Sequence, residues 1–105
     1  MPTFEIQVVD LAAEELKEIR AFERRRIVDE IESQLANQPT QVTKNRKRLD
    51  PAVADFEHVP PIWELRVGEF RVFYDIDESA QIVFVRAVRR KRQDQTTEDV
   101  IHERD

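Results

Sequence analysis

The chain of 105 residues contains no cysteine and a single glycine, Gly68. Without cysteine it forms neither disulfides nor thiolate metal sites, and nothing indicates an oxidising compartment. One glycine cannot build a glycine-rich phosphate-binding loop. No window approaches the roughly 18 consecutive apolar residues of a membrane span, and no basic segment precedes an apolar run at the start. The sequence therefore predicts a cytoplasmic protein that does not enter the membrane.

Metal-binding side chains are also scarce. The only histidines, His58 and His102, are far apart in the chain, so a zinc site is not expected. Asp75, Asp77 and Glu78 resemble part of a calcium loop, but its glycine and remaining ligands are missing, which favours a solvated hairpin turn. No potential nucleophile has an obvious base beside it. We expect neither a metal nor a cofactor.

The composition is that of one small domain spanning residues 1–105, with 40% hydrophobic and 8% aromatic residues. The net charge of -5 argues against nucleic acid, but the charge is unevenly distributed. Residues 41–92 carry 11 basic and 8 acidic side chains, whereas both flanking segments are acidic. This pattern is compatible with a local anion-binding face on an otherwise acidic protein.

The segment 63–88 carries the clearest secondary-structure pattern. Apolar and polar residues alternate over 63–67 and again over 70–75, which is the period of a half-buried strand. Gly68 stands between these runs and suits a tight hairpin turn, because glycine adopts a positive φ without strain. Residues 82–88 form a nearly continuous apolar run, typical of an interior strand. Together they predict a three-stranded antiparallel meander.

The N-terminal part predicts a strand over residues 4–8 and helical structure after it. Asp10 is expected to be the N-cap. Apolar residues at three- and four-residue spacing over 11–35 predict helix, but the pattern slips at 21–23. One long helix would span about 40 Å, long for so small a domain, while a helical hairpin lacks a Gly or Pro at its corner. From these residues alone both alternatives stay open.

Basic residues gather in two clusters, with two more arginines inside the predicted strands. The first cluster falls in the weakly periodic segment 40–61, and the second follows the last strand. A charge run is usually a solvated loop, but cations within strands favour convergence on one face that binds phosphate. The residues are Lys44, Arg46, Lys47 and Arg48 in the first cluster, Arg89, Arg90, Lys91 and Arg92 in the second, and Arg71 and Arg86 in the strands.

Cations alone are sufficient for one reaction of RNA, the attack of a 2′-hydroxyl on its adjacent phosphate. The protein must bend the strand, remove a proton and stabilise the charge of the transition state. A lysine crowded by cations has its pKa lowered toward that of a base, and guanidinium groups hold phosphate oxygens. Residues 93–105 then predict either a short helix begun by Thr96 or Thr97, or a flexible tail.

The order of TKNRKRL, WELRVGEFRVFYDID and IVFVRAV followed by a basic run resembles the RelE-type toxins of bacterial type II toxin-antitoxin systems, in the RelE/ParE superfamily. The resemblance implies an α+β fold, β-α-α-β-β-β, with a small antiparallel sheet and an N-terminal helical hairpin on one face. It also implies a metal-independent, ribosome-dependent messenger RNA endonuclease that inhibits translation. Its partners are then the ribosome, messenger RNA and a cognate antitoxin.

Within that resemblance, Arg71 falls on the arginine at the scissile phosphate, and Lys44, Lys47 and Lys91 are the other candidate catalytic residues. The remaining arginines are expected to bind RNA, namely Arg46, Arg48, Arg86, Arg89, Arg90 and Arg92. The chain departs from RelE by having Thr97 where RelE has a C-terminal tyrosine, and by its acidic balance. Two alternatives follow: a ParE-like DNA gyrase poison, or an inactive toxin-fold protein that binds an antitoxin.

Overall fold

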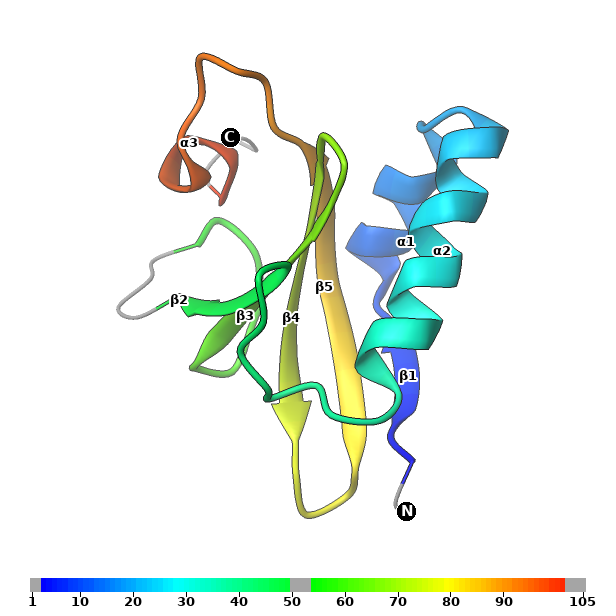
Figure 1. Ribbon diagram of the computed structural model, residues 1–105, viewed down its shortest axis with the longest axis vertical. Helices are drawn as coiled ribbons and strands as arrows, with labels where there is room; N and C mark the ends of the chain where they lie inside the picture. Colours follow the sequence, from blue (N-terminus) through cyan, green and yellow to red (C-terminus); the bar gives the residue numbers. More distant parts are fainter. Residues whose placement is uncertain (1–2, 50–53, 102–105) are drawn as a thin grey trace.

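The computed structural model describes residues 3–49 and 54–101, which form an α+β fold around one sheet (Figure 1). Five strands pair in the order β1-β5-β4-β3-β2. None of the described helices is both long and apolar enough to cross a bilayer. The elements are β1 (Glu5–Val8), α1 (Asp10–Lys17), α2 (Ala21–Leu35), β2 (Arg46–Leu49), β3 (Ile62–Val67), β4 (Phe70–Asp77), β5 (Ile82–Arg90) and α3 (Thr97–Ile101).

The predicted meander is confirmed in strands β3, β4 and β5, which pair antiparallel in sequence order. Gly68 occupies the β3–β4 turn with φ of 58°, a left-handed conformation that a residue with a Cβ rarely adopts. The Arg26 guanidinium packs over it, so a Cβ there would lie 3.1 Å from Arg26 Nη1. The hairpin tip therefore depends on glycine for conformation and for the close approach of α2.

The sheet differs from the expected antiparallel one in two respects. β1 pairs in parallel with β5, so the sheet is mixed; the two helices form part of the long connection that parallel pairing requires. β2 is an additional strand, antiparallel to β3, within the segment expected to be irregular. Its four residues are too short and too basic to show the alternation that marks the other strands.

The helical hairpin is confirmed, and a side chain rather than a glycine closes its corner. α1 ends at Lys17 and α2 begins at Ala21, just before the slip in the apolar pattern. Arg24 Nη1 donates to the Lys17 and Ile19 carbonyls at 3.4 Å each, which satisfies acceptors left free at the end of α1. The expected N-cap is shifted by one residue: Val9 is the N-cap and Asp10 lies in the first turn.

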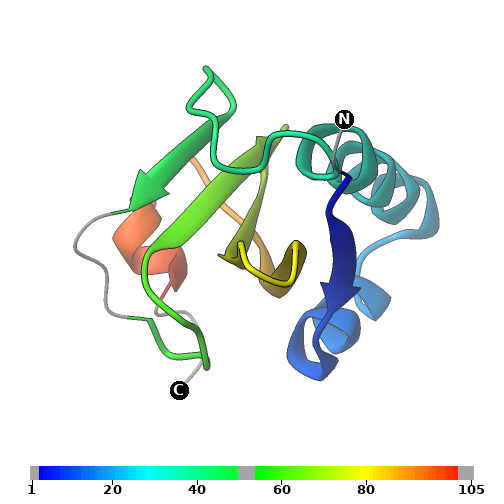
Figure 2. The ribbon, with the colours of Figure 1, turned by 90° about the horizontal axis from the view of Figure 1, so that it is seen from below.

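The sheet is covered on both faces, as Figures 1 and 2 show. α1 and α2 pack on one face, against a core that contains the stacked rings of Trp63 and Tyr74, 6.2 Å apart. The Tyr74 hydroxyl donates to the Pro39 carbonyl at 2.8 Å, and burial raises the pKa of Tyr74. α3 packs on the opposite face with Phe73 and Phe56. We refer to these as the helical-hairpin face and the α3 face.

The short helix expected in the tail is confirmed over Thr97–Ile101. The Asp99 amide donates to Thr96 Oγ1 at 3.2 Å, and the Thr96 amide donates to Asp99 Oδ2 at 3.0 Å. This reciprocal pair satisfies donors at the start of the helix. His102 and the rest of the tail, residues 102–105, lie outside the described residues.

Candidate functional site

Arg71 holds the β3–β4 hairpin together from the α3 face. The side chain is buried, with 7% of its surface exposed. Its Nη1 donates to the Gly68 and Phe70 carbonyls, both at 2.9 Å. Burial lowers the pKa of Arg71, the Glu64 carboxylate raises it, and Arg66 lowers it. The guanidinium expected to meet a phosphate is thus directed at the backbone of its own hairpin.

Glu64 places a buried carboxylate among the candidate catalytic cations. Its Oε1 lies 3.7 Å from Lys47 Nζ and its Oε2 lies 4.0 Å from Arg71 Nε. Thr97 Oγ1 donates to Oε2 at 3.1 Å. This hydrogen bond ties the first residue of α3 to Glu64 of β3. The sequence-based interpretation did not include Glu64. Its place opposite Lys47 and next to Arg71 follows from the pairing of β3 with β2 and β4.

Arg86 forms a close ion pair and does not project freely from β5. Its Nε donates to Asp75 Oδ2 at 2.8 Å, and its guanidinium carbon lies 4.8 Å from the centroid of the Phe84 ring. Asp75 is itself buried. The Arg86 charge is therefore compensated within the sheet.

Arg89 is buried and joins three separate parts of the chain. Its Nε donates to Glu15 Oε2 at 2.9 Å, and Asp55 Oδ1 lies 2.9 Å from its Nη2. Its Nη1 donates to the Val100 carbonyl at 2.9 Å and to the Ile101 carbonyl at 3.2 Å. These partners belong to α1, the segment before β3 and α3. Arg89 therefore anchors the C-terminal helix to the sheet.

Arg46 and Arg90 lie on the helical-hairpin face. Arg46 is buried, and its Nη1 donates to the Gln34 carbonyl at 2.8 Å and the Gln38 carbonyl at 2.6 Å. It therefore closes the C-terminal end of α2. Arg90 pairs with the carboxylates of Glu69 and Glu23, and its guanidinium carbon lies 4.6 Å above the Phe70 ring.

The expected convergence of all the cations on one face is wrong. Arg46 and Arg48 pair in register with Leu65 and Trp63, and Arg90 pairs with Phe70, so these three share the helical-hairpin face. The opposite face carries Lys47, Arg71, Arg86 and Arg89. Alternation along a strand separates neighbours such as Arg46 and Lys47. A cluster that is continuous in the sequence is thus divided by the sheet.

The remaining candidates are exposed or half-buried. Lys44 is exposed in the turn before β2, and Lys47 has 57% of its side chain exposed. Arg92 lies 3.9 Å from Asp94 at the surface. The Lys91 amide donates to the Glu69 carbonyl at 2.6 Å, which places Lys91 beside the β3–β4 turn. Whether these residues act on RNA stays a prediction.

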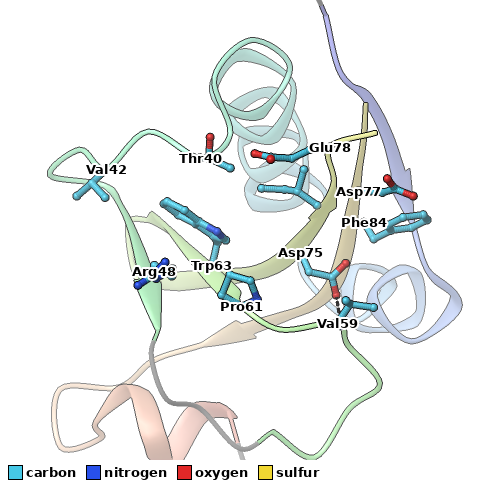
Figure 3. Close-up of a pocket in the computed structure, with 11 residues that line it drawn as sticks. Thr40, Val42, Arg48, Val59, Pro61, Trp63, Asp75, Asp77, Glu78 and Phe84 are labelled. Carbon is cyan, nitrogen blue, oxygen red and sulfur yellow. Dashed lines mark hydrogen bonds between the residues drawn. The ribbon is translucent and has the colours of Figure 1, made fainter. Parts of the chain in front are cut away.

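A large cleft lies elsewhere, at the end of β4 and β5 opposite to Arg71 and Arg89 (Figure 3). Its volume is about 880 Å³. Trp63 lies in its centre, with apolar side chains from two connections and acidic side chains from the β4–β5 turn around it. The lining residues are Thr40, Val42, Arg48, Val59, Pro61, Trp63, Asp75, Ile76, Asp77, Glu78 and Phe84.

The model of the family described as the ParE toxin of the type II toxin-antitoxin system, parDE, matches residues 6–95. Among solved structures, a chain of the RelBE2 toxin-antitoxin complex from Mycobacterium tuberculosis is 19% identical, with a TM-score of 0.70 over 87% of this chain and 94% of that chain. A chain of the archaeal RelE-RelB complex from Pyrococcus horikoshii OT3 is 16% identical, with a TM-score of 0.66 over 90% of this chain and 100% of that chain. Both likenesses show the fold. No curated protein matches the chain.

Proposed function

The chain belongs to the ParE toxin family of type II toxin-antitoxin systems, and from that premise we propose that it stops growth by binding DNA gyrase rather than by cutting messenger RNA. A gyrase poison of this kind needs no catalytic residues. We also propose a cognate antitoxin as its partner, since the similar folds of known structure were solved as toxin-antitoxin complexes. Gyrase and ribosomes are both cytoplasmic, so we place its action in the cytoplasm.

The observation that carries this proposal is that three arginines on the α3 face, two of them buried, already bond to the protein itself. Arg71, Arg86 and Arg89 direct their guanidinium groups at carbonyls and carboxylates of the protein itself. To hold a phosphate they would first have to leave these partners, and separating a buried ion pair costs about 3 to 5 kcal/mol. Donors that stabilise a transition state are normally free and already aimed at the developing charge.

Glu64 supports the same conclusion. A carboxylate that is 5% exposed lies within 4.0 Å of both Lys47 and Arg71. Its negative charge repels a phosphate from the position where these two cations would act together.

One observation favours the second candidate, ribosome-dependent cleavage of messenger RNA. Lys44, Lys91 and Arg92 are exposed or half-buried, and they occupy the positions that the RelE resemblance gives to basic residues. Neither Lys44 nor Lys91 has a side-chain ion pair within the described residues. These cations are available to contact an RNA backbone, whereas the buried Arg71 and Arg89 are not.

The two functions are separated by inducing the toxin in bacteria without its antitoxin and examining DNA and messenger RNA in the same culture. Gyrase poisoning predicts double-strand breaks and filamentous cells with intact transcripts. Purified toxin should then also convert supercoiled plasmid to linear DNA in the presence of gyrase. Transcripts cut within codons, with intact DNA, would overturn the proposal.

The variant Lys44→Gln with Lys91→Gln provides the matched test. Both side chains lie outside the buried ion pairs, so the fold is retained. We expect toxicity to be unchanged if gyrase is the target, whereas RNA cleavage would lose two of its exposed cations and much of its activity. Normal growth at verified expression of the unchanged chain would contradict both functions and leave an inactive protein that binds an antitoxin.

A further inference from the structure

The cleft around Trp63 exposes apolar surface that the protein leaves uncovered. Among the described residues four large apolar side chains are exposed, and two of them, Val42 at 67% and Val59 at 58%, line this cleft. Figure 3 shows them on either side of Trp63, with Pro61 between Trp63 and Val59. Apolar side chains grouped at one hollow mark a binding surface more often than scattered ones do.

Hydrogen bonds to the sheet fix both apolar walls. The Val59 amide donates to Asp75 Oδ2 at 2.8 Å, which holds the connection before β3 against β4. On the other side, the Tyr74 hydroxyl donates to the Pro39 carbonyl at 2.8 Å, near the start of the connection that carries Val42. The cleft is thus formed before anything binds, which lowers the entropic cost of binding.

The β4–β5 turn makes one side of the cleft acidic. Asp77 Oδ1 accepts hydrogen bonds from the Ala80 amide at 3.0 Å and Ser79 Oγ at 2.8 Å. The bond from the Ala80 amide is the main cause that lowers the pKa of Asp77, so the carboxylate is ionised at neutral pH. Neither Asp77 nor Glu78 forms an ion pair with any residue in the described ranges.

We propose that this cleft binds the toxin-contacting segment of the antitoxin, through an apolar side chain seated against Trp63 and a Lys or Arg side chain facing Asp77 and Glu78. The proposal rests on the proposed function, because it assigns a surface to that partner. The DNA bound by gyrase and the messenger RNA on the ribosome would both present phosphates, which these two carboxylates repel. A volume of about 880 Å³ holds a few side chains, so the cleft is one contact within a larger interface.

The test measures the affinity of the toxin for the polypeptide encoded by the short reading frame beside its own gene, by titration calorimetry. The two are produced together, separated and refolded. We expect Val42→Asp and Glu78→Lys each to weaken binding by about tenfold or more. Gln41→Asp is the matched control for Val42→Asp, because Gln41 is also exposed, lies in the same connection and does not line the cleft. It should leave the affinity unchanged.

Charge reversal identifies the basic partner. Each Lys or Arg of the antitoxin is changed to Glu in turn and tested against toxin carrying Glu78→Lys. One of these changes should restore most of the lost affinity. Restoration by none of them, or wild-type affinity of both cleft variants, would overturn the proposal.

Two other outcomes have separate meanings. If the unchanged toxin does not bind the neighbouring polypeptide, the proposed antitoxin partner is wrong and the cleft proposal fails with it. If the toxin alone sediments as a dimer that Val42→Asp dissociates, the cleft is occupied by a second copy of the chain and the antitoxin assignment is overturned.

Discussion

Arg71 and Arg89 are direct cross-strand partners on β4 and β5, yet different parts of the chain hold their guanidinium groups. Arg71 is bonded to carbonyls of the hairpin beside it, whereas Arg89 is bonded to a carboxylate of α1 and to the end of α3. Two adjacent buried cations repel each other, so each needs its own acceptors. Arg71 therefore holds the β3–β4 hairpin, while Arg89 ties α1 and α3 to β5.

Replacing Arg89 should be the most damaging single change in this network. Arg89→Ala leaves the carboxylates of Glu15 and Asp55 without the cation they share and removes the donor to the end of α3. We expect a loss of about 3 to 5 kcal/mol in the free energy of unfolding, measured by urea denaturation. Arg92→Ala is the control, and it should change stability by less than about 0.5 kcal/mol because Arg92 is at the surface.

Arg71→Ala tests whether Arg71 stabilises the hairpin. The change leaves two carbonyls of the hairpin without a charged donor, so we expect a loss of about 1.5 to 3 kcal/mol. Arg66→Ala, on the adjacent strand and exposed, should cost much less. A catalytic Arg71 would instead be replaceable with little effect on stability. If Arg71→Ala unfolds at the same urea concentration as the wild type, the structural role is contradicted.

Arg46→Ala should loosen the C-terminal end of α2. Its guanidinium satisfies the Gln34 and Gln38 carbonyls, and we expect about 1.5 to 3 kcal/mol of destabilisation with faster amide hydrogen exchange in the last turn of the helix. Lys47→Ala is the adjacent control, since Lys47 faces the other side of the sheet and is mostly exposed. Equal effects of the two substitutions would rule out the capping role.

Gly68→Ala tests the conformational requirement at the β3–β4 turn. With φ of 58°, an alanine Cβ is strained and presses on the Arg26 guanidinium at 3.1 Å. We expect a loss of about 1 to 2 kcal/mol. Gly68→Asn should cost less, because asparagine tolerates this conformation better than alanine does. Thermal unfolding of both variants measures the order, and the reverse order would show that steric contact rather than φ decides the cost.

The sequence predicted the meander well because strands β3, β4 and β5 carry their signal locally. Alternation and one glycine were enough to find them. The parallel pairing of β1 and the existence of β2 were not predictable in this way, since both depend on contacts between distant segments. β2 in particular has a basic sequence that reads as a loop until β3 is placed beside it.

The candidate site was predicted less well because a cation in the sequence carries no sign of its partner. Glu15 is 74 positions from Arg89 in the chain, and only the fold brings them together. The cleft around Trp63 escaped notice for a similar reason. Val42 and Val59 lie in connections, where isolated apolar residues have no periodicity, and the acidic turn looked solvated.

The parallel pairing of β1 with β5 also determines when, during synthesis, the sheet can be completed. Among the described strands β1 is hydrogen-bonded only to β5, which is synthesised after the other four. In a nascent chain β1, α1 and α2 are therefore synthesised before the strand with which β1 pairs. A chain that stops before residue 82 therefore lacks the partner strand of β1, and the five-stranded sheet cannot form in it.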